Sequence, residues 1–213
     1  MLVAKTSARL PESAHTSQPF RIHEIAPDFR LEDVWGLPAP GGPDDFARAV
    51  DLIARFDTSQ SSSLPVRALF ALRWKLGELF GWDDPDTGVG GRVPTLRDRL
   101  PADLRDAPSG PQFESLPFEP LYLLDDEFAA EVANKTMHGV MHLSRVQEDD
   151  GSYRGQMAVL VKPNGLFGRG YMAAIRPFRH LIVYPPLIRE IERKWRDAAS
   201  GPASGARSPA GAP

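Results

Sequence analysis

Residues 119–162 read EPLYLLDDEFAAEVANKTMHGVMHLSRVQEDDGSYRGQMAVLVK, and this stretch decides the predicted fold. It contains four mainly apolar segments that are separated by short polar connections, such as Glu148–Gly151. Segments of this length with short polar turns between them are typical of β-hairpins. The stretch therefore predicts four consecutive antiparallel strands, Glu119–Leu124, Phe128–Ala133, Met137–Gln147 and Ser152–Lys162.

Helical patterns lie on both sides of this predicted sheet. Over residues 166–197 apolar side chains recur every three or four positions, which indicates a long C-terminal helix. Pro177 and Pro185–Pro186 each remove a backbone donor and crowd the preceding turn, so this helix should kink or divide near both points. The other predicted elements are a short strand over Phe29–Trp35 and two helices over residues 44–56 and 64–80.

The length of 213 residues suits a single domain, which we expect over residues 20–198. Residues 199–213 are almost only Ala, Gly, Pro and Ser, and such a segment buries too little apolar surface to become ordered. We expect disordered tails over residues 1–19 and 199–213. Residues 83–117 are rich in Asp, Gly, Pro and Arg and are interpreted as an insertion, in which Thr95 and Asp98 predict the capped start of a short helix.

The composition excludes several classes of function. The chain has no cysteine, which excludes disulfides, thiolate catalysis and cysteine-bound metal clusters. Its formal net charge of −3 supplies no general attraction to nucleic acid or anionic lipid. No stretch approaches the ~20 apolar residues of a membrane span or forms a signal-peptide core. We therefore expect a cytoplasmic protein with neither a nucleic-acid nor a membrane partner.

Two short motifs could suggest a metal or a phosphate, but their spacing argues against both. His138 and His142 lie on a predicted strand, where four residues span ~13 Å. Two zinc-bound nitrogens must lie within about 4 Å of each other, so a shared metal is not expected. The glycines of residues 165–170 do not match the dinucleotide fingerprint and are interpreted as a strand-to-helix turn. We expect no metal and no cofactor.

The last predicted helix carries the most distinctive polar cluster. Arg176, His180 and Tyr184 are spaced four apart and share one face, with Arg179 close by. A charged group beneath a sheet needs a partner, because an unpaired buried charge costs several kcal/mol. One interpretation is a structural ion pair of Arg179 with Glu131, or with Asp126 or Glu127 in the preceding turn. The other is that Arg176 and His180, together with Tyr122 or Tyr184, bind the polar end of an otherwise apolar ligand.

These elements predict an α+β fold in which a curved antiparallel sheet wraps around the long C-terminal helix, with two short helices after the first strand. Residues 126–139, 155–159 and 171–185 resemble an uncharacterised bacterial family that is related to the START-like, helix-grip superfamily. The similarity covers about Ile25 to Arg196. The resemblance implies a cavity between the sheet and the long helix. It implies no reaction, because that superfamily includes lipid carriers, hormone receptors, polyketide cyclases and co-chaperones.

Three functional hypotheses remain open from the sequence. The first is a domain that binds a small, mostly apolar molecule in a cavity. The second is an enzyme of the cyclase, dehydratase or isomerase kind, with His180 as acid or base and Arg176 steadying negative charge. The third is an accessory module of an oxidoreductase, because the resembling family also occurs fused behind NAD-binding epimerase-like modules. For the first hypothesis the candidate ligand-binding residues are Tyr122, Met137, Met141, Met157 and Tyr184.

Overall fold

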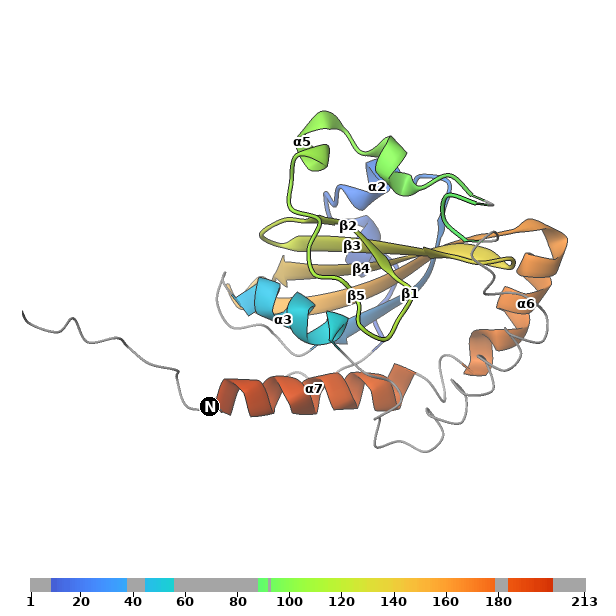
Figure 1. The fold of residues 1–213 in the computed structure, drawn as a ribbon. Helices are drawn as coiled ribbons and strands as arrows, with labels where there is room; N and C mark the ends of the chain where they lie inside the picture. The colour runs from blue at the N-terminus through green and yellow to red at the C-terminus, as the bar shows by residue number, and fades with distance from the viewer. Residues whose placement is uncertain (1–8, 38–44, 56–87, 92, 179–183, 201–213) are drawn as a thin grey trace, which may run out of the picture.

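The computed structural model describes residues 9–37, 45–55, 88–91, 93–178 and 184–200. Its centre is one five-stranded antiparallel sheet with the strand order β1-β5-β4-β3-β2 (Figure 1). The predicted run of four consecutive strands is confirmed, and β1 adds to the edge formed by β5. The strands are β1 (Arg30–Leu37), β2 (Glu119–Leu123), β3 (Glu127–Ala133), β4 (Met137–Gln147) and β5 (Tyr153–Pro163).

Short helices cover one face of this sheet, which we call the upper face, and longer helices cover the lower face (Figure 1). The helix α6 follows directly after β5 and connects it to the last helix. The upper helices are α1 (Ser13–Thr16), α2 (Ile22–Ile25), η3 (Leu96–Arg99) and α5 (Ala102–Arg105); the others are α3 (Asp45–Ala54), α6 (Gly165–Phe178) and α7 (Tyr184–Ser200). None of these described helices is long and apolar enough to cross a membrane.

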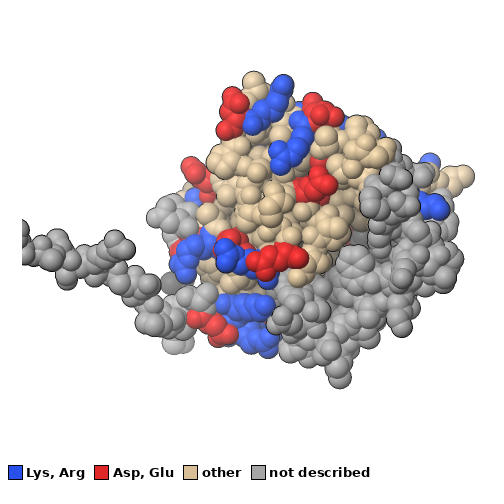
Figure 2. Space-filling view, viewed as in Figure 1, with Lys and Arg blue, Asp and Glu red and all other residues tan. Residues whose placement is uncertain are grey.

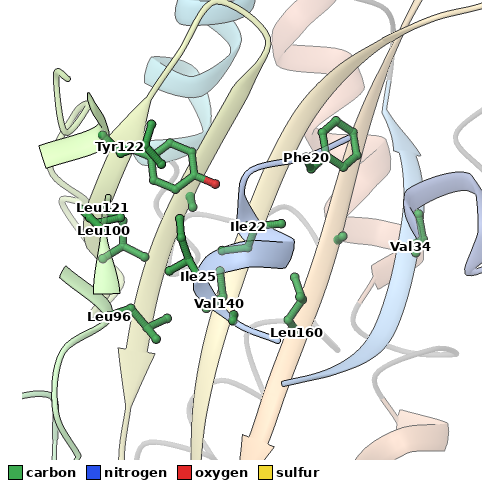
Figure 3. Close-up of a cluster of buried hydrophobic side chains, with 14 of the residues drawn as sticks. Phe20, Ile22, Ile25, Val34, Leu96, Leu100, Leu121, Tyr122, Val140 and Leu160 are labelled. Atoms are coloured by element: carbon green, nitrogen blue, oxygen red, sulfur yellow. The ribbon is translucent and has the colours of Figure 1, made fainter. Parts of the chain in front are cut away.

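Strand alternation divides the buried side chains between the two faces. On β4, Val140 and Val146 pack with the upper core, whereas Met141 and Leu143 pack with the lower core. This follows from the two-residue period of a strand. Figure 3 shows the upper core, which includes Phe20, Ile22, Ile25, Leu96, Leu100, Leu121, Tyr122 and Leu160. The lower core consists of Trp35, Phe46, Val50, Ile53, Phe128, Ala130, Met141, Leu143, Met157, Tyr184, Ile188 and Ile191.

The described C-terminal residues form two helices, α6 and α7, which agrees with the predicted division of one long helix. Helix α6 ends at Phe178, the residue after Pro177, and α7 begins at Tyr184. Pro185 and Pro186 then occupy the first turn of α7, where a missing amide hydrogen breaks no helical bond.

The glycines before α6 form the strand-to-helix turn expected from the sequence. Gly165 has a φ of 69°, which is a left-handed conformation that favours glycine. A Cβ atom on Gly168 would lie 2.1 Å from the carbonyl oxygen of Thr136. Glycine at this position therefore lets the first turn of α6 lie directly against the turn between β3 and β4.

The N-terminal segment differs from the disordered tail expected over residues 1–19, because residues 9–19 belong to the packed structure. The amide of Leu10 donates to the carbonyl of Val34 at 2.8 Å, which attaches the segment to β1. In α1, His15 is only 1% exposed. The physical reason is that the imidazole of His15 finds a buried polar partner on the upper face, which composition alone does not reveal.

The insertion contains the short helical turns that its sequence predicts. The Thr95 side chain accepts a hydrogen bond from the amide of Arg97 at 3.1 Å and caps η3. Leu96, Leu100 and Leu104 are all buried in the upper core, so this part of the insertion contributes to the hydrophobic core of the domain. The helix predicted over residues 64–80 and the tail beyond residue 200 lie outside the described residues.

Ion pairs attach the insertion to the N-terminal helices and to β5. Arg21 and Asp103 are 2.6 Å apart, and Arg99 and Asp28 are also 2.6 Å apart. Asp28 accepts a second bond from Lys162 of β5 at 2.7 Å. The hydrogen bond from Arg99, followed by that from Lys162, holds the pKa of Asp28 well below its usual range although burial opposes the shift. These pairs are largely exposed, so they add orientation more than stability.

Candidate functional site

Two buried glutamate–histidine pairs lie side by side on the upper face of β3 and β4. Glu127 Oε1 lies 3.0 Å from His142 Nε2, and Glu131 Oε2 lies 2.7 Å from His138 Nε2. Directly opposite Glu127 on β4 is Ser144, two residues after His142, and directly opposite Glu131 is Val140, two residues after His138. Each histidine therefore contacts its glutamate diagonally across the two strands. All four side chains are buried. The repeated diagonal arrangement arises because both the glutamates and the histidines are four residues apart along their strands.

Glu127 gathers four hydrogen-bond donors. Its Oε1 accepts from the Tyr122 hydroxyl at 2.5 Å, from the Ile22 amide at 2.9 Å and from His142. Its Oε2 accepts from the Arg21 amide at 2.9 Å. Burial alone raises the pKa of Glu127, but the interaction with His142 and the hydrogen bonds from Tyr122 and the Arg21 amide outweigh it and hold the pKa at about 2. The carboxyl group is therefore ionised at neutral pH.

The histidine of this first pair continues into a chain of three imidazoles. His15 Nε2 lies 3.1 Å from His142 Nδ1, and His23 Nε2 lies 3.1 Å from His15 Nδ1. An ionised carboxylate only accepts hydrogen bonds, so the Nε2 atom of His142 carries the hydrogen that faces Glu127. With its pKa held at about 3, His15 is uncharged at neutral pH and carries one ring hydrogen, so it donates to one of its two imidazole neighbours and accepts from the other.

The surroundings disfavour the charged forms of His15 and His23. Burial, followed by the charges of His142 and His23, lowers the pKa of His15 to about 3 against the opposing effect of Glu127. Burial and the charge of His142 also lower the pKa of His23, which is only partly buried. The ring of Phe20 lies 5.0 Å from that of His15 and 4.9 Å from that of His142, measured between centroids. Chemically, this chain of three imidazoles can hold α1 and α2 on the sheet. It can also relay a proton between the partly exposed His23 and Glu127.

The second pair, Glu131 and His138, attaches the insertion to the sheet. Glu131 accepts a hydrogen bond from the Thr95 hydroxyl, and the amide of Leu96 donates to both of its carboxylate oxygens at 3.1 and 3.2 Å. The remaining donor is His138. The start of η3 is thereby attached to β3, as the N-terminal helices are attached through Glu127.

The two histidines of the HxxxH motif bind separate glutamates, so they do not face a common centre. Within the described ranges there is no group of three or more histidine, aspartate or glutamate side chains placed to hold a metal ion.

The structure brings together three of the five candidate ligand-binding residues. Met141, Met157 and Tyr184 meet in the lower core, where the ring centroids of Tyr184 and Trp35 are 5.4 Å apart. Met137 lies on the same face of β4 and is only partly buried. Tyr122 lies on the opposite face, bound to Glu127, because residue 122 of β2 points to the upper side.

The polar cluster predicted on the last helix is only partly described. Arg176 lies within α6, but its side chain is outside what the structure describes, as are Arg179 and His180 altogether. The carboxylate of Glu131, which the sequence paired with Arg179, is bound by Thr95, Leu96 and His138.

The lower face also holds two residues, Trp35 and Arg145, whose buried donors lack an acceptor. The indole Nε1 of Trp35 has no hydrogen-bond partner, although the residue is only 7% exposed. The Nε and Nη1 atoms of Arg145 are buried and equally without a hydrogen-bond acceptor. On the upper face the Ser144 hydroxyl and the Gln156 Nε2 are unpaired as well, directly opposite each other on β4 and β5.

Among the hollows on the surface of the described residues are two that are not bounded by Met137, Met141 or Met157. One, of about 380 Å³, is lined by Pro27, Asp28, Phe29, Arg30, Val161, Pro163 and Arg169. The other, of about 620 Å³, lies between α3 and α7 and is lined by Ala47, Arg48, Asp51, Leu52, Arg55 and Lys194. Figure 2 shows acidic and basic side chains interspersed on the visible face, which argues against a field of one sign there.

Sequence reasoning missed the role of Glu127, although a signal for it was present. Two glutamates four apart in one apolar strand, followed by two histidines four apart in the next, predict cross-strand pairs once the hairpin is accepted. No comparable signal marks His15 and His23, which reach the sheet from a segment more than 100 residues earlier.

The comparison with protein families matches residues 25–186 to a family described as Protein of unknown function (DUF2867). The chain belongs to this family. The matched segment includes both glutamate–histidine pairs, Trp35 and Arg145, whereas His15 and His23 precede it. No curated protein and no solved structure matches the chain.

Proposed function

We propose that this member of the DUF2867 family binds a small, mostly apolar molecule between the lower face of its sheet and α7. The observation that carries the proposal is the indole N–H of Trp35, which is buried without a hydrogen-bond partner. A buried donor left unpaired costs about 1–3 kcal/mol, and native proteins rarely tolerate it without a reason. A ligand that carries a hydrogen-bond acceptor recovers this energy.

The residues around Trp35 suit an apolar ligand. Met141, Met157 and Tyr184 belong to the same lower core as the indole, Met157 lies directly opposite Trp35 on β5, and the ring centroid of Tyr184 is 5.4 Å from that of Trp35. Methionine side chains are flexible and polarisable, so they can repack around a guest molecule. Because these residues are buried in the described structure, entry of the ligand requires a shift of α7 and its apolar stripe, Ile188 and Ile191, away from the sheet.

A helix-grip relationship to START-like proteins is part of the same proposal. A curved antiparallel sheet covered by the C-terminal helix supports it, as does the resemblance of residues 126–139 and 171–185 noted above.

Native mass spectrometry of the purified full chain tests the function. We expect a bound species of defined mass in a one-to-one complex, and a raised melting temperature when apolar small molecules from a library are added. Trp35→Phe keeps the aromatic ring but removes the donor, so it should weaken binding, whereas Trp195→Phe on α7 should not. Absence of both a bound mass and any melting shift across the library contradicts the proposal.

A further inference from the structure

We propose that the ligand carries a carboxylate at its polar end and that Arg145 and Trp35 together bind this group. The inference rests on the proposed function and names the chemical class of its ligand. Its basis is that three buried donors of the lower face, Trp35 Nε1 and Arg145 Nε and Nη1, have no hydrogen-bond partner, while the buried Asp33 carboxylate of that face lies further along β1, opposite Val159. An acceptor-only group complements such a set, and an ionised carboxylate is the commonest of these in small molecules.

The strand register places the two residues on the same face of the sheet. Trp35 is opposite Met157, and Arg145 is opposite Gly155, two residues earlier on β5. With strands ~4.8 Å apart and ~3.3 Å between residues, their Cα atoms are separated by about 12 Å. Both side chains are long enough to reach a common group between them. Gly155 contributes no side chain to that part of the face, which leaves room for the group beside β5.

The charge on Arg145 selects an anion over a neutral acceptor. Its guanidinium lies over the ring of Tyr153, with the Cζ atom 4.5 Å from the ring centroid. That contact leaves the two buried N–H groups without acceptors, and no carboxylate among the described residues bonds to them. A partly buried charge is costly unless it is paired. The forked guanidinium fits a carboxylate with two parallel hydrogen bonds, which a hydroxyl or an ester cannot reproduce.

The two donors also orient the ligand. The carboxylate lies near Gly155 and Arg145, and the apolar body extends along the lower face towards Met157 and Met141, which follow along the same strands. A linear or branched aliphatic carboxylic acid has this division into a charged end and an apolar body.

The test compares decanoate with decanol, which share a chain length and differ in the polar end, by isothermal titration calorimetry on the full chain. We expect decanoate to bind at least tenfold more tightly than decanol. Arg145→Gln should remove most of this preference by weakening decanoate alone. Arg154→Gln is the matched control, because Arg154 neighbours Gly155 but bonds to Glu148 and Gln156, and it should preserve the preference.

The outcomes separate the two proposals. Equal binding of decanoate and decanol overturns the carboxylate inference and leaves the proposed function standing, whereas binding of neither contradicts the proposed function itself. If the Arg145→Gln protein keeps the preference for decanoate over decanol, a group other than Arg145 binds the carboxylate, and the inference is overturned. If Arg145→Gln does not fold, Arg145→Lys keeps the charge but not the fork, and the preference should fall by about tenfold.

Discussion

At the scale of single residues, Glu127 shows how one carboxylate organises a buried polar region. It accepts hydrogen bonds from β2, β4 and the two amides that begin α2. Because it is ionised, it also requires a hydrogen on the Nε2 atom of His142, which faces it. The rest of the network is arranged around this single charge.

Replacing Glu127 by glutamine tests this role. The amide removes the charge and presents an NH₂ group to at least one of the present donors, so we expect Glu127→Gln to lower the free energy of unfolding by about 2–4 kcal/mol. Urea denaturation followed by circular dichroism measures the change. Glu119→Gln, at an exposed position on β2, is the control and should change stability by less than about 0.5 kcal/mol. Equal effects of the two substitutions contradict the assigned role.

At the scale of elements, the position of α6 depends on backbone contact at its first turn. The close approach of Gly168 to the carbonyl of Thr136 leaves no room for a methyl group, whereas a Cβ atom on Gly170 would meet nothing within 4 Å. The two glycines lie in the same helix and two positions apart, so they form a matched pair.

We expect Gly168→Ala and Gly170→Ala to change stability in opposite directions. Gly168→Ala forces α6 away from the turn between β3 and β4 and should cost about 1–3 kcal/mol. Gly170→Ala adds helix propensity at an open site and should contribute up to about 1 kcal/mol. Thermal unfolding monitored by circular dichroism distinguishes them, and a Gly168→Ala protein as stable as the wild type shows that the contact is not a constraint.

The attachment of α1 and α2 to the sheet makes stability depend on pH. His15 faces His142 of β4, His23 of α2 and Glu127 of β3, and its pKa falls from 6.5 to about 3 on folding. Below about pH 6.5 the unfolded chain therefore binds a proton that the folded protein rejects, which costs up to about 1.4 kcal/mol per pH unit. The lowered pKa of His23 acts in the same direction. Glu127 adds to the effect below about pH 4.5, since its folded pKa is about 2.

We therefore expect the free energy of unfolding to be highest above pH 6.5 and to fall steadily on acidification. Urea denaturation of the full chain at a series of pH values between 7.5 and 5 measures the slope. His15→Phe keeps a ring in the same place but removes the titrating group and its hydrogen bonds. We expect a lower free energy of unfolding at neutral pH, and a slope of that free energy against pH that is smaller by the uptake of about one proton. An unchanged slope in His15→Phe contradicts the assignment of the pH dependence to His15.

At the scale of the whole molecule, the sheet is covered on both faces by segments from the two ends of the chain. Phe20 and Ile22 come from before the segment that the family comparison matches, and Ile188 and Ile191 come from after it. The matched residues 25–186 thus contain all five strands but lack part of the cover of each face.

A chain shortened to residues 25–186 should consequently fail to unfold cooperatively. Its upper face loses His15, Phe20 and Ile22, and its lower face loses most of α7, so buried apolar area and the partners of Glu127 and His142 become exposed. Differential scanning calorimetry, with the full chain as control, measures the loss of the transition. A sharp transition within a few degrees of the control shows that the end segments are not required.

Much of the sheet was predictable from local pattern, and the polar site was not. The four strands from Glu119 to Lys162, the division of the last helix at Pro177 and the cap at Thr95 each follow from residues close together in the sequence. The prediction grouped Tyr122 with Met141 and Met157, but Tyr122 lies on the opposite, upper face of the sheet. The reason is a register shift on β2 between Pro120 and Tyr122, which turns the Tyr122 side chain to that face. The N-terminal segment was predicted as a tail because no local pattern shows what His15 meets.

The sequence by itself determined the run of four antiparallel strands from β2 to β5, the strand-to-helix turn before α6 and the exclusion of thiol chemistry, since periodicity, glycines and composition act locally. Only the tertiary structure decided that His15 and His23 complete a chain beginning at Glu127, and that Trp35 and Arg145 share one face as unpaired donors. The physical reason is that burial and hydrogen-bond partners depend on contacts between segments far apart along the chain. Such contacts depend on how β1 and the N-terminal helices dock on the sheet, which no local pattern encodes.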